Sequence, residues 1–109
     1  MIKYLTITII CVFILHSCIS PCEEVKTHCK TLNCSFKITE KSKDRLIDFK
    51  GFDKNNIHAE FKEFEYWGIY NFVEIGDTLY KEFGKTDLIL IKKDTTLVFP
   101  LYCRGKIVE

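Results

Sequence analysis

The sequence predicts a mainly β fold, a small antiparallel meander or an open barrel or sandwich, after an amino-terminal signal helix. Short segments in which apolar and polar residues alternate recur along most of the chain, as they do in half-buried strands. The links between them are short and rich in Gly, Asp, Asn and Lys, which suits turns between antiparallel neighbours. With 109 residues, of which 47% are hydrophobic, the chain has room for one domain with a small core.

The expected β domain covers residues 35–109. Its first strand follows from the alternation of Phe36 and Ile38 with polar neighbours. The next segment, residues 40–44, is almost entirely charged and therefore predicts a turn. A second strand is expected over residues 45–51, where apolar and polar side chains alternate again.

The segment 57–67 fits either a helix or a strand. Ile57, Phe61 and Phe64 have the spacing of one helical face, and several neighbours are good helix formers. Ile57, Ala59 and Phe61 also alternate as they would in a strand. The preceding sequence DKNN is typical of a turn whose side chains bond to their own backbone. We favour a strand.

The last third of the chain predicts a meander of three strands, at residues 79–82, 88–92 and 96–102. The sequences FGKT and KKDT separate them, and links this short require antiparallel neighbours. The apolar run at 88–91 predicts a central strand that is buried on both faces. Pro100 has no amide hydrogen to donate, so its strand is expected at an edge of the sheet.

The charge balance argues against nucleic-acid binding. The chain has 16 Lys and Arg residues against 15 Asp and Glu residues, which gives a formal net charge of +1 without a basic block. It contains no G-x-S-x-G elbow, no P-loop and no H-E-x-x-H motif. We therefore expect neither an enzyme nor a bound cofactor.

Residues 1–17 have the pattern of a signal peptide. Lys3 provides a positive charge, and an apolar stretch follows over residues 5–15. A helix that crosses the hydrocarbon core of a membrane needs about 20 apolar residues. This stretch is too short for a retained membrane span, so we expect the segment to direct export and to be removed.

The sequence Leu15, His16, Ser17, Cys18 resembles the lipobox of bacterial lipoproteins, with three of its four positions matching. The resemblance implies cleavage between Ser17 and Cys18 and acylation of Cys18, and two or more acyl chains anchor a protein stably in a membrane. Ile19 resembles the residue that follows the cysteine in lipoproteins sorted to the outer membrane. The expected location is therefore the bacterial cell envelope. The alternative is a plain secretory signal that is cut after Ser17 and leaves Cys18 without lipid.

Six cysteines in so short a chain indicate an oxidising compartment. If Cys11 leaves with the signal peptide and Cys18 carries lipid, four disulfide candidates remain, namely Cys22, Cys29, Cys34 and Cys103. The sequence leaves their three possible pairings open. We read residues 18–34 as a cysteine-rich tether and a stapled loop or helical turn. We favour a bridge from the segment 22–34 to Cys103, because long closed loops stabilise most.

A metal site is the alternative use of these cysteines. His28 together with Cys22, Cys29 and Cys34 offers four potential zinc ligands. Their spacing contains no C-x-x-C pair, the usual knuckle of structural zinc sites. We therefore expect no metal.

The sequence Gly76, Asp77, Thr78, Leu79, Tyr80, Lys81 resembles the GDS-hydrophobic-x-K segment of small exported bacterial proteins of unknown function, in which a β-hairpin follows. Gly76 suits a turn with positive φ, and Asp77 suits a cap of that turn. Lys81 is expected to face solvent at the edge of a strand, where a charge discourages association between sheets.

An aromatic cluster contains Tyr66, Trp67 and Tyr70. Core packing is the plain interpretation of this cluster, and a binding surface for a sugar or a peptide is the functional one. We expect a binding domain, with an envelope protein or a glycan as its partner.

The sequence is also compatible with two other functions, inhibition of lysozyme and hydrolysis. Small lipoproteins that inhibit lysozyme also place a disulfide-stapled β domain on a lipid anchor, so this chain resembles them in architecture. A hydrolase would need His58 in a cleft beside an Asp or Glu side chain.

Overall fold

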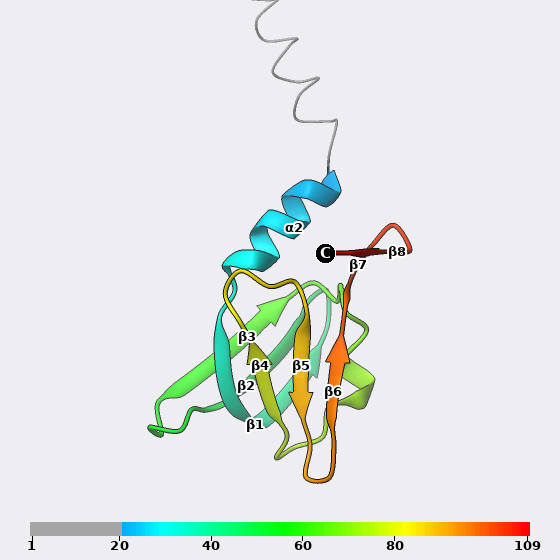
Figure 1. Ribbon diagram of the computed structural model, residues 1–109. Helices are drawn as coiled ribbons and strands as arrows, with labels where there is room; N and C mark the ends of the chain where they lie inside the picture. Colours follow the sequence, from blue (N-terminus) through cyan, green and yellow to red (C-terminus); the bar gives the residue numbers. More distant parts are fainter. Residues whose placement is uncertain (1–20) are drawn as a thin grey trace, which may run out of the picture.

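A six-stranded antiparallel sheet forms most of the computed structural model, which describes residues 21–109 (Figure 1). The mainly β, antiparallel fold class predicted from the sequence is confirmed. The expected signal peptide at 1–17, its cleavage site at Ser17 and Cys18, and the lipidation at Cys18 lie outside the described residues.

One helix precedes the strands. The elements in chain order are α2 (Pro21–Thr31), β1 (Cys34–Lys43), β2 (Ile47–Phe52), β3 (His58–Glu63), the 3-10 helix η1 (Tyr70–Phe72), β4 (Thr78–Lys81), β5 (Leu88–Ile91), β6 (Thr96–Phe99), β7 (Leu101–Cys103) and β8 (Lys106–Val108). The sheet has the strand order β3-β2-β1-β4-β5-β6, and β7 and β8 form a separate hairpin. The sheet is therefore two meanders joined through the pairing of β1 with β4.

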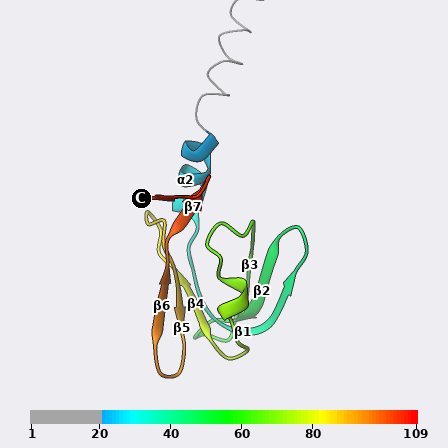
Figure 2. The same cartoon turned by 90° about the vertical axis from the view of Figure 1, so that its right-hand side faces the viewer.

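The sheet curls strongly around β1. The register of β1 against β2 shifts between Ile38 and Glu40, and such a bulge bends and twists a strand. In Figure 2, β1, β2 and β3 lie on one side and β4, β5 and β6 on the other. The result is an open barrel with free edges at β3 and β6.

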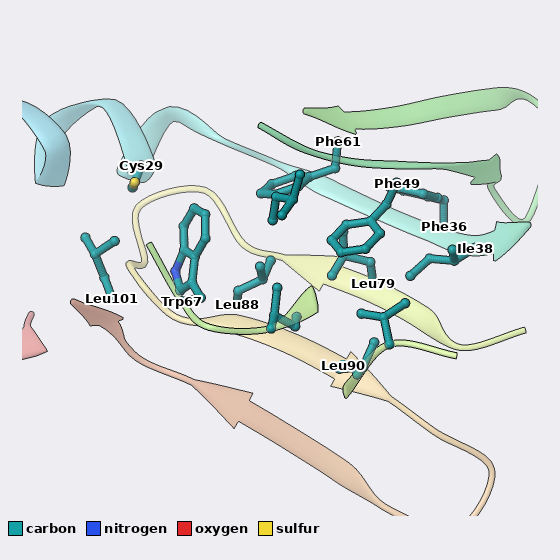
Figure 3. Close-up of a cluster of buried hydrophobic side chains, with 13 residues drawn as sticks. Cys29, Phe36, Ile38, Phe49, Phe61, Trp67, Leu79, Leu88, Leu90 and Leu101 are labelled. Atoms are coloured by element: carbon teal, nitrogen blue, oxygen red, sulfur yellow. The ribbon is translucent and has the colours of Figure 1, made fainter. Parts of the chain in front are cut away.

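The core fills the space between the two sides of the sheet. Figure 3 shows Phe49 and Phe61 from one side and Leu79, Leu88 and Leu90 from the other. Trp67, Ile69 and Val73, from the segment between β3 and β4, complete the core. The alternating burial along β1, β2, β4 and β5 follows from the strand period of two. The buried apolar set is Cys29, Phe36, Ile38, Ile47, Phe49, Phe61, Trp67, Ile69, Val73, Leu79, Leu88, Leu90 and Leu101.

Helix α2 lies over one end of the barrel. Pro21 begins it, a position where the missing amide hydrogen costs nothing, and Glu23 and Glu24 in its first turn favour the positive end of the helix dipole. His28 Nε2 lies 3.0 Å from a carboxylate oxygen of Glu63 at the end of β3. The polar segment expected as a tether and stapled loop or helical turn is thus a helix of three turns.

The predicted turn at residues 40–44 is wrong. β1 continues to Lys43 and pairs with β2 down to the contact of Lys43 with Ile47, so the turn is confined to residues 44–46. All residues from Thr39 to Lys43 are exposed. A strand whose two faces both meet water has no apolar alternation, and its charges therefore resemble those of a turn.

The strand interpretation of residues 57–67 is confirmed for β3, which spans His58–Glu63. The turn before it is confirmed as well. Asp53 Oδ1 accepts hydrogen bonds from the backbone amides of Asn55 at 2.8 Å and Ile57 at 3.0 Å. Residues 64–67 lie beyond the strand.

β5 pairs with β4 on one side and β6 on the other, so it is the central strand of the predicted three-stranded meander. It is not buried on both faces as its apolar run predicted, because within β5 only Leu88 and Leu90 are buried. Ile89 is half-buried and Ile91 is 41% exposed on the outer face. The third predicted strand is divided at Pro100 into β6 and β7, and β6 is an edge strand as the proline indicated.

The prediction for Lys81 is also wrong. β4 lies between β1 and β5, and Lys81 points into the protein with no exposed surface. Its ammonium group donates hydrogen bonds to the carbonyl oxygens of Leu32, Glu82 and Lys85. Burial lowers the pKa of this ammonium group. Lys81 therefore joins the link between α2 and β1 to the β4–β5 turn instead of protecting an edge.

Candidate functional site

A disulfide joins the two ends of the described chain. Cys22 in the first turn of α2 is bonded to Cys103 at the end of β7, with a Cα–Cα distance of 5.8 Å and a sequence separation of 81. This is a bridge of the kind that the sequence favoured, from the segment 22–34 to Cys103. It fixes the helix and the carboxyl-terminal hairpin to each other at one end of the molecule.

The β7–β8 hairpin turns at Arg104 and Gly105, both with positive φ (54° and 78°). Two central residues with positive φ define a turn of type I′, the geometry that suits a two-residue hairpin. Tyr102 pairs with Ile107, and both side chains point outward with exposed fractions of 43% and 56%. The sequence contains a signal for this hairpin, because Arg-Gly separates two short apolar runs, but the strand predicted at 96–102 runs through Pro100 and leaves the hairpin out.

Cys29 and Cys34, two of the four disulfide candidates, are free thiols. Burial, followed by the negative charge of Glu63, raises the pKa of the Cys29 thiol from 9.0 to about 11. Burial raises the pKa of the Cys34 thiol to about 12, against the opposing effect of Lys81. Both side chains therefore act as small apolar groups where α2 meets the sheet.

These raised pKa values predict that both thiols resist alkylation while the protein is folded. With a pKa near 11 in place of 9.0, the thiolate fraction of Cys29 at pH 8 falls about a hundredfold, and burial restricts access further. We expect iodoacetamide to modify Cys29 and Cys34 within minutes in denaturant without reductant, and to modify neither of them in the native protein. Modification of Cys34 at the rate of a free peptide thiol would contradict this packing. The alkylated positions are read by peptide mass spectrometry.

The aromatic cluster divides between the core and the surface. Trp67 is 2% exposed, and its indole nitrogen donates to the Thr86 carbonyl oxygen at 3.0 Å. Its ring contacts Phe61 and Tyr66, each with 5.7 Å between centroids. The structure therefore removes Trp67 from the predicted binding surface and assigns it to the core. Tyr66 is half-buried beside it.

Both faces of the Tyr70 ring are in contact with other side chains. Its ring stacks on Phe49 with centroids 6.0 Å apart, while the ammonium groups of Lys41 and Lys43 lie 4.8 and 5.7 Å from its centroid. Lys41 also donates to the Val73 carbonyl oxygen at 2.8 Å. With one face covered by the core and two lysines already in contact, Tyr70 has little free area for a ligand.

A groove of about 440 Å³ lies on the outer face of the sheet where β1, β2 and β4 meet. Phe52, at the end of β2, is 42% exposed and provides an aromatic ring there. His58 packs edge-on against Phe52, with 5.7 Å between ring centroids, and fixes this ring from the neighbouring strand. We call this the Phe52 groove, and it is lined by Ser35, Phe36, Lys37, Thr39, Phe52, Asp53, Lys54, Asn56 and Thr78.

The chemistry of the Phe52 groove is that of a polar ligand site with one aromatic platform. Its hydroxyl and amide side chains offer both donors and acceptors, and Lys37 and Lys54 offer positive charge. Such a combination fits a hydroxylated ligand with an apolar ring face and an acidic group. Phe52 was not predicted as a site residue, because its position beside the DKNN turn does not indicate that the ring is exposed.

A second groove of about 500 Å³ lies between α2, the β4–β5 turn and β8. It is lined by Lys30, Gly84, Lys85, Thr86, Asp87, Val98, Pro100, Ile107 and Glu109. Its basic and acidic side chains balance, two of each, whereas two lysines and one aspartate line the Phe52 groove. No aromatic side chain lines this second groove. It is therefore the weaker candidate for a ligand site.

His58 does not meet the requirement for a hydrolytic base. It is exposed on the edge strand β3, and its ring contacts Phe52. Among residues 21–109 no ion pair involves His58. The hydrolase hypothesis was conditional on a cleft and a carboxylate partner at this residue, and the geometry provides neither.

Residues 21–109 contain no cluster of three or more His, Cys, Asp or Glu side chains arranged to hold a metal ion. None of the helices formed within this range has the length and hydrophobicity to cross a membrane.

Comparisons with known proteins yielded no relative. No family model matches the chain, and neither a curated protein nor a solved structure matches it.

Proposed function

We propose that the protein is a lipid-anchored protein of the bacterial cell envelope whose small β domain binds an envelope glycan. The anchor is proposed at Cys18, in the sequence that resembles a lipobox. Two features support export to an oxidising compartment: the signal-peptide pattern at residues 1–17 and the Cys22–Cys103 disulfide.

The exposed ring of Phe52 is the main reason for proposing a glycan as the ligand. A half-exposed aromatic side chain in a polar groove offers its face to the C–H groups of a sugar ring, while the surrounding hydroxyl, amide and ammonium groups can bond to the sugar's oxygens. Lys37 and Lys54 favour a glycan that carries carboxylate or phosphate groups. This ligand matches the glycan partner expected from the sequence, but at a different place from the Tyr66, Trp67, Tyr70 cluster.

The test is binding of the full-length protein in detergent to soluble peptidoglycan fragments and to an acidic polysaccharide, measured by calorimetry. We expect Phe52→Ala to weaken binding about tenfold, since a central aromatic contact contributes more than about 1 kcal/mol. Phe83→Ala is the matched control, because Phe83 is 67% exposed on the β4–β5 turn, away from the groove.

Equal losses of affinity in the two variants would exclude the Phe52 groove as the binding site. Absence of binding by the unchanged protein would contradict the glycan proposal. The same preparation is assayed against a panel of lysozymes, because the inhibitor hypothesis predicts loss of lysozyme activity at micromolar protein.

A further inference from the structure

The disulfide places the carboxyl-terminal hairpin close to the proposed point of lipid attachment. Cys103 is bonded to Cys22, and Cys22 follows Cys18 by four residues. Four residues span at most about 14 Å when fully extended. The Cα atoms of Cys22 and Cys103 are 5.8 Å apart. The hairpin is therefore held near the membrane surface whenever acyl chains on Cys18 are inserted.

The outward face of this hairpin suits the interface of a bilayer. Tyr102 and Ile107 form a cross-strand pair with 43% and 56% exposure. Tyrosine is enriched at membrane interfaces because its ring is apolar and its hydroxyl is polar. Arg104 and Lys106, at the turn, have long apolar stems that allow the charged ends to reach the headgroups. Glu109 is the only acidic side chain in residues 101–109.

The inner face of the hairpin is fixed to the domain, so its orientation is not free. Leu101 is fully buried, and Val108, its partner across the hairpin, packs against the core. The Tyr102 amide donates to the Tyr66 carbonyl oxygen at 3.1 Å. In Figure 1 the hairpin lies at the same end of the molecule as α2, whereas the β2–β3 and β5–β6 turns lie at the opposite end.

From this arrangement we infer that the β7–β8 hairpin lies in the lipid bilayer interface, with Tyr102 and Ile107 in contact with the upper part of the acyl chains. The inference rests on the proposed anchor at Cys18 and adds which face of the domain meets the lipid. The local excess of positive charge is small, so apolar contact rather than attraction to anionic lipid holds the hairpin there. The Phe52 groove, on the outer face of the sheet, is left accessible to a ligand.

The test uses tryptophan reporters in the full chain. Protein purified from producing cells is first weighed by mass spectrometry to confirm acyl chains at Cys18, and is then reconstituted into phosphatidylcholine vesicles that contain brominated lipid. Tyr102→Trp places a reporter on the hairpin. Ile57→Trp is the matched control, because Ile57 is 60% exposed at the β2–β3 turn. The unchanged protein gives the contribution of Trp67, which is buried.

We expect brominated lipid to quench the reporter at position 102 at least about twofold, because bromine quenches only a ring that enters the upper acyl region. The reporter at position 57 should be unaffected. Adding Ile107→Asp to Tyr102→Trp should abolish the quenching, since a carboxylate resists insertion. Vesicles with anionic lipid should give the same result as phosphatidylcholine.

The contrary outcomes separate this inference from the proposed function. Acylated protein that floats with the vesicles, but whose reporter at position 102 is quenched no more than that at position 57, would overturn the hairpin contact and leave the anchor intact. Protein without acyl chains that does not float would overturn both the anchor and the contact. Quenching only with anionic lipid would show attachment by charge and would overturn the apolar contact.

Discussion

Removal of the Cys22–Cys103 bridge by the double change Cys22→Ser and Cys103→Ser is expected to lower the free energy of unfolding by about 4 kcal/mol. The bridge closes a loop of 81 residues, nearly the whole described chain, and so restricts the unfolded state strongly. A loss of this size is a large part of the stability of a small domain. The measurement is equilibrium unfolding in urea, monitored by fluorescence.

Two comparisons establish that the bridge itself is responsible. Reduction of the unchanged protein should give the same loss as the double variant, because both open the same loop. Cys34→Ser should cost less than about 1 kcal/mol, since it changes a half-buried free thiol without opening a loop. If the double variant and Cys34→Ser were equally stable, the bridge would not hold the two ends of the domain together.

Gly51→Ala is expected to cost about 3 kcal/mol, near the upper end for an overpacked site. A Cβ atom at Gly51 would overlap the carbonyl oxygen of Lys37 and would lie 2.7 Å from its carbonyl carbon and 3.1 Å from the Cα atom of Ile38. These are backbone atoms of β1 beside the bulge, where the sheet curls. Relief of the overlap would therefore require β1 and β2 to separate.

The control for Gly51 is Gly105→Ala. Gly105 has a φ of 78° but no atom within 4 Å of the position of a Cβ, so its cost is conformational, about 1 kcal/mol. Thermal unfolding of the two variants separates the effects. A midpoint for Gly51→Ala as high as that for Gly105→Ala would mean that β1 and β2 do not approach as closely as described.

The alternation of side chains predicted most of the sheet correctly. Strands β1, β2, β4 and β6 were expected within a few residues, because inward-facing and outward-facing side chains alternate along them. β5 was expected from its apolar run instead. The prediction failed where this rule does not apply. The last residues of β1 meet water on both faces, and Ile89 and Ile91 are apolar although they lie on the outer face.

Lys81 shows a different kind of failure. Its spacing of two from the buried Leu79 places it on the inner face of β4. Lys81 was nevertheless predicted to face solvent, because a charged side chain is rarely buried without a partner. The partners are three backbone carbonyl oxygens from segments distant in sequence or beyond the strand, and these cannot be identified before the fold is known.

The candidate sites were less predictable than the strands. The bridge from the segment 22–34 to Cys103 was expected from the general advantage of a long loop, but the choice of Cys22 depends on how α2 lies over the barrel. Phe52 and Tyr102 are candidate contact residues because their rings are exposed. Which rings are exposed depends on which face of the curled sheet is covered, and this cannot be seen before the fold is known. Trp67 sits in the core for the same reason.

The central claim is that the mature protein begins at an acylated Cys18 and is closed by one disulfide. Intact and peptide mass spectrometry of the protein from the membrane fraction of its own cells, with and without reduction, tests it most directly. We expect an amino-terminal peptide that starts at Cys18 with acyl chains attached, a bridged pair of peptides that contain Cys22 and Cys103, and a gain of two hydrogens on reduction. An amino terminus at an unmodified Cys18, or a chain that retains Met1, would contradict the account.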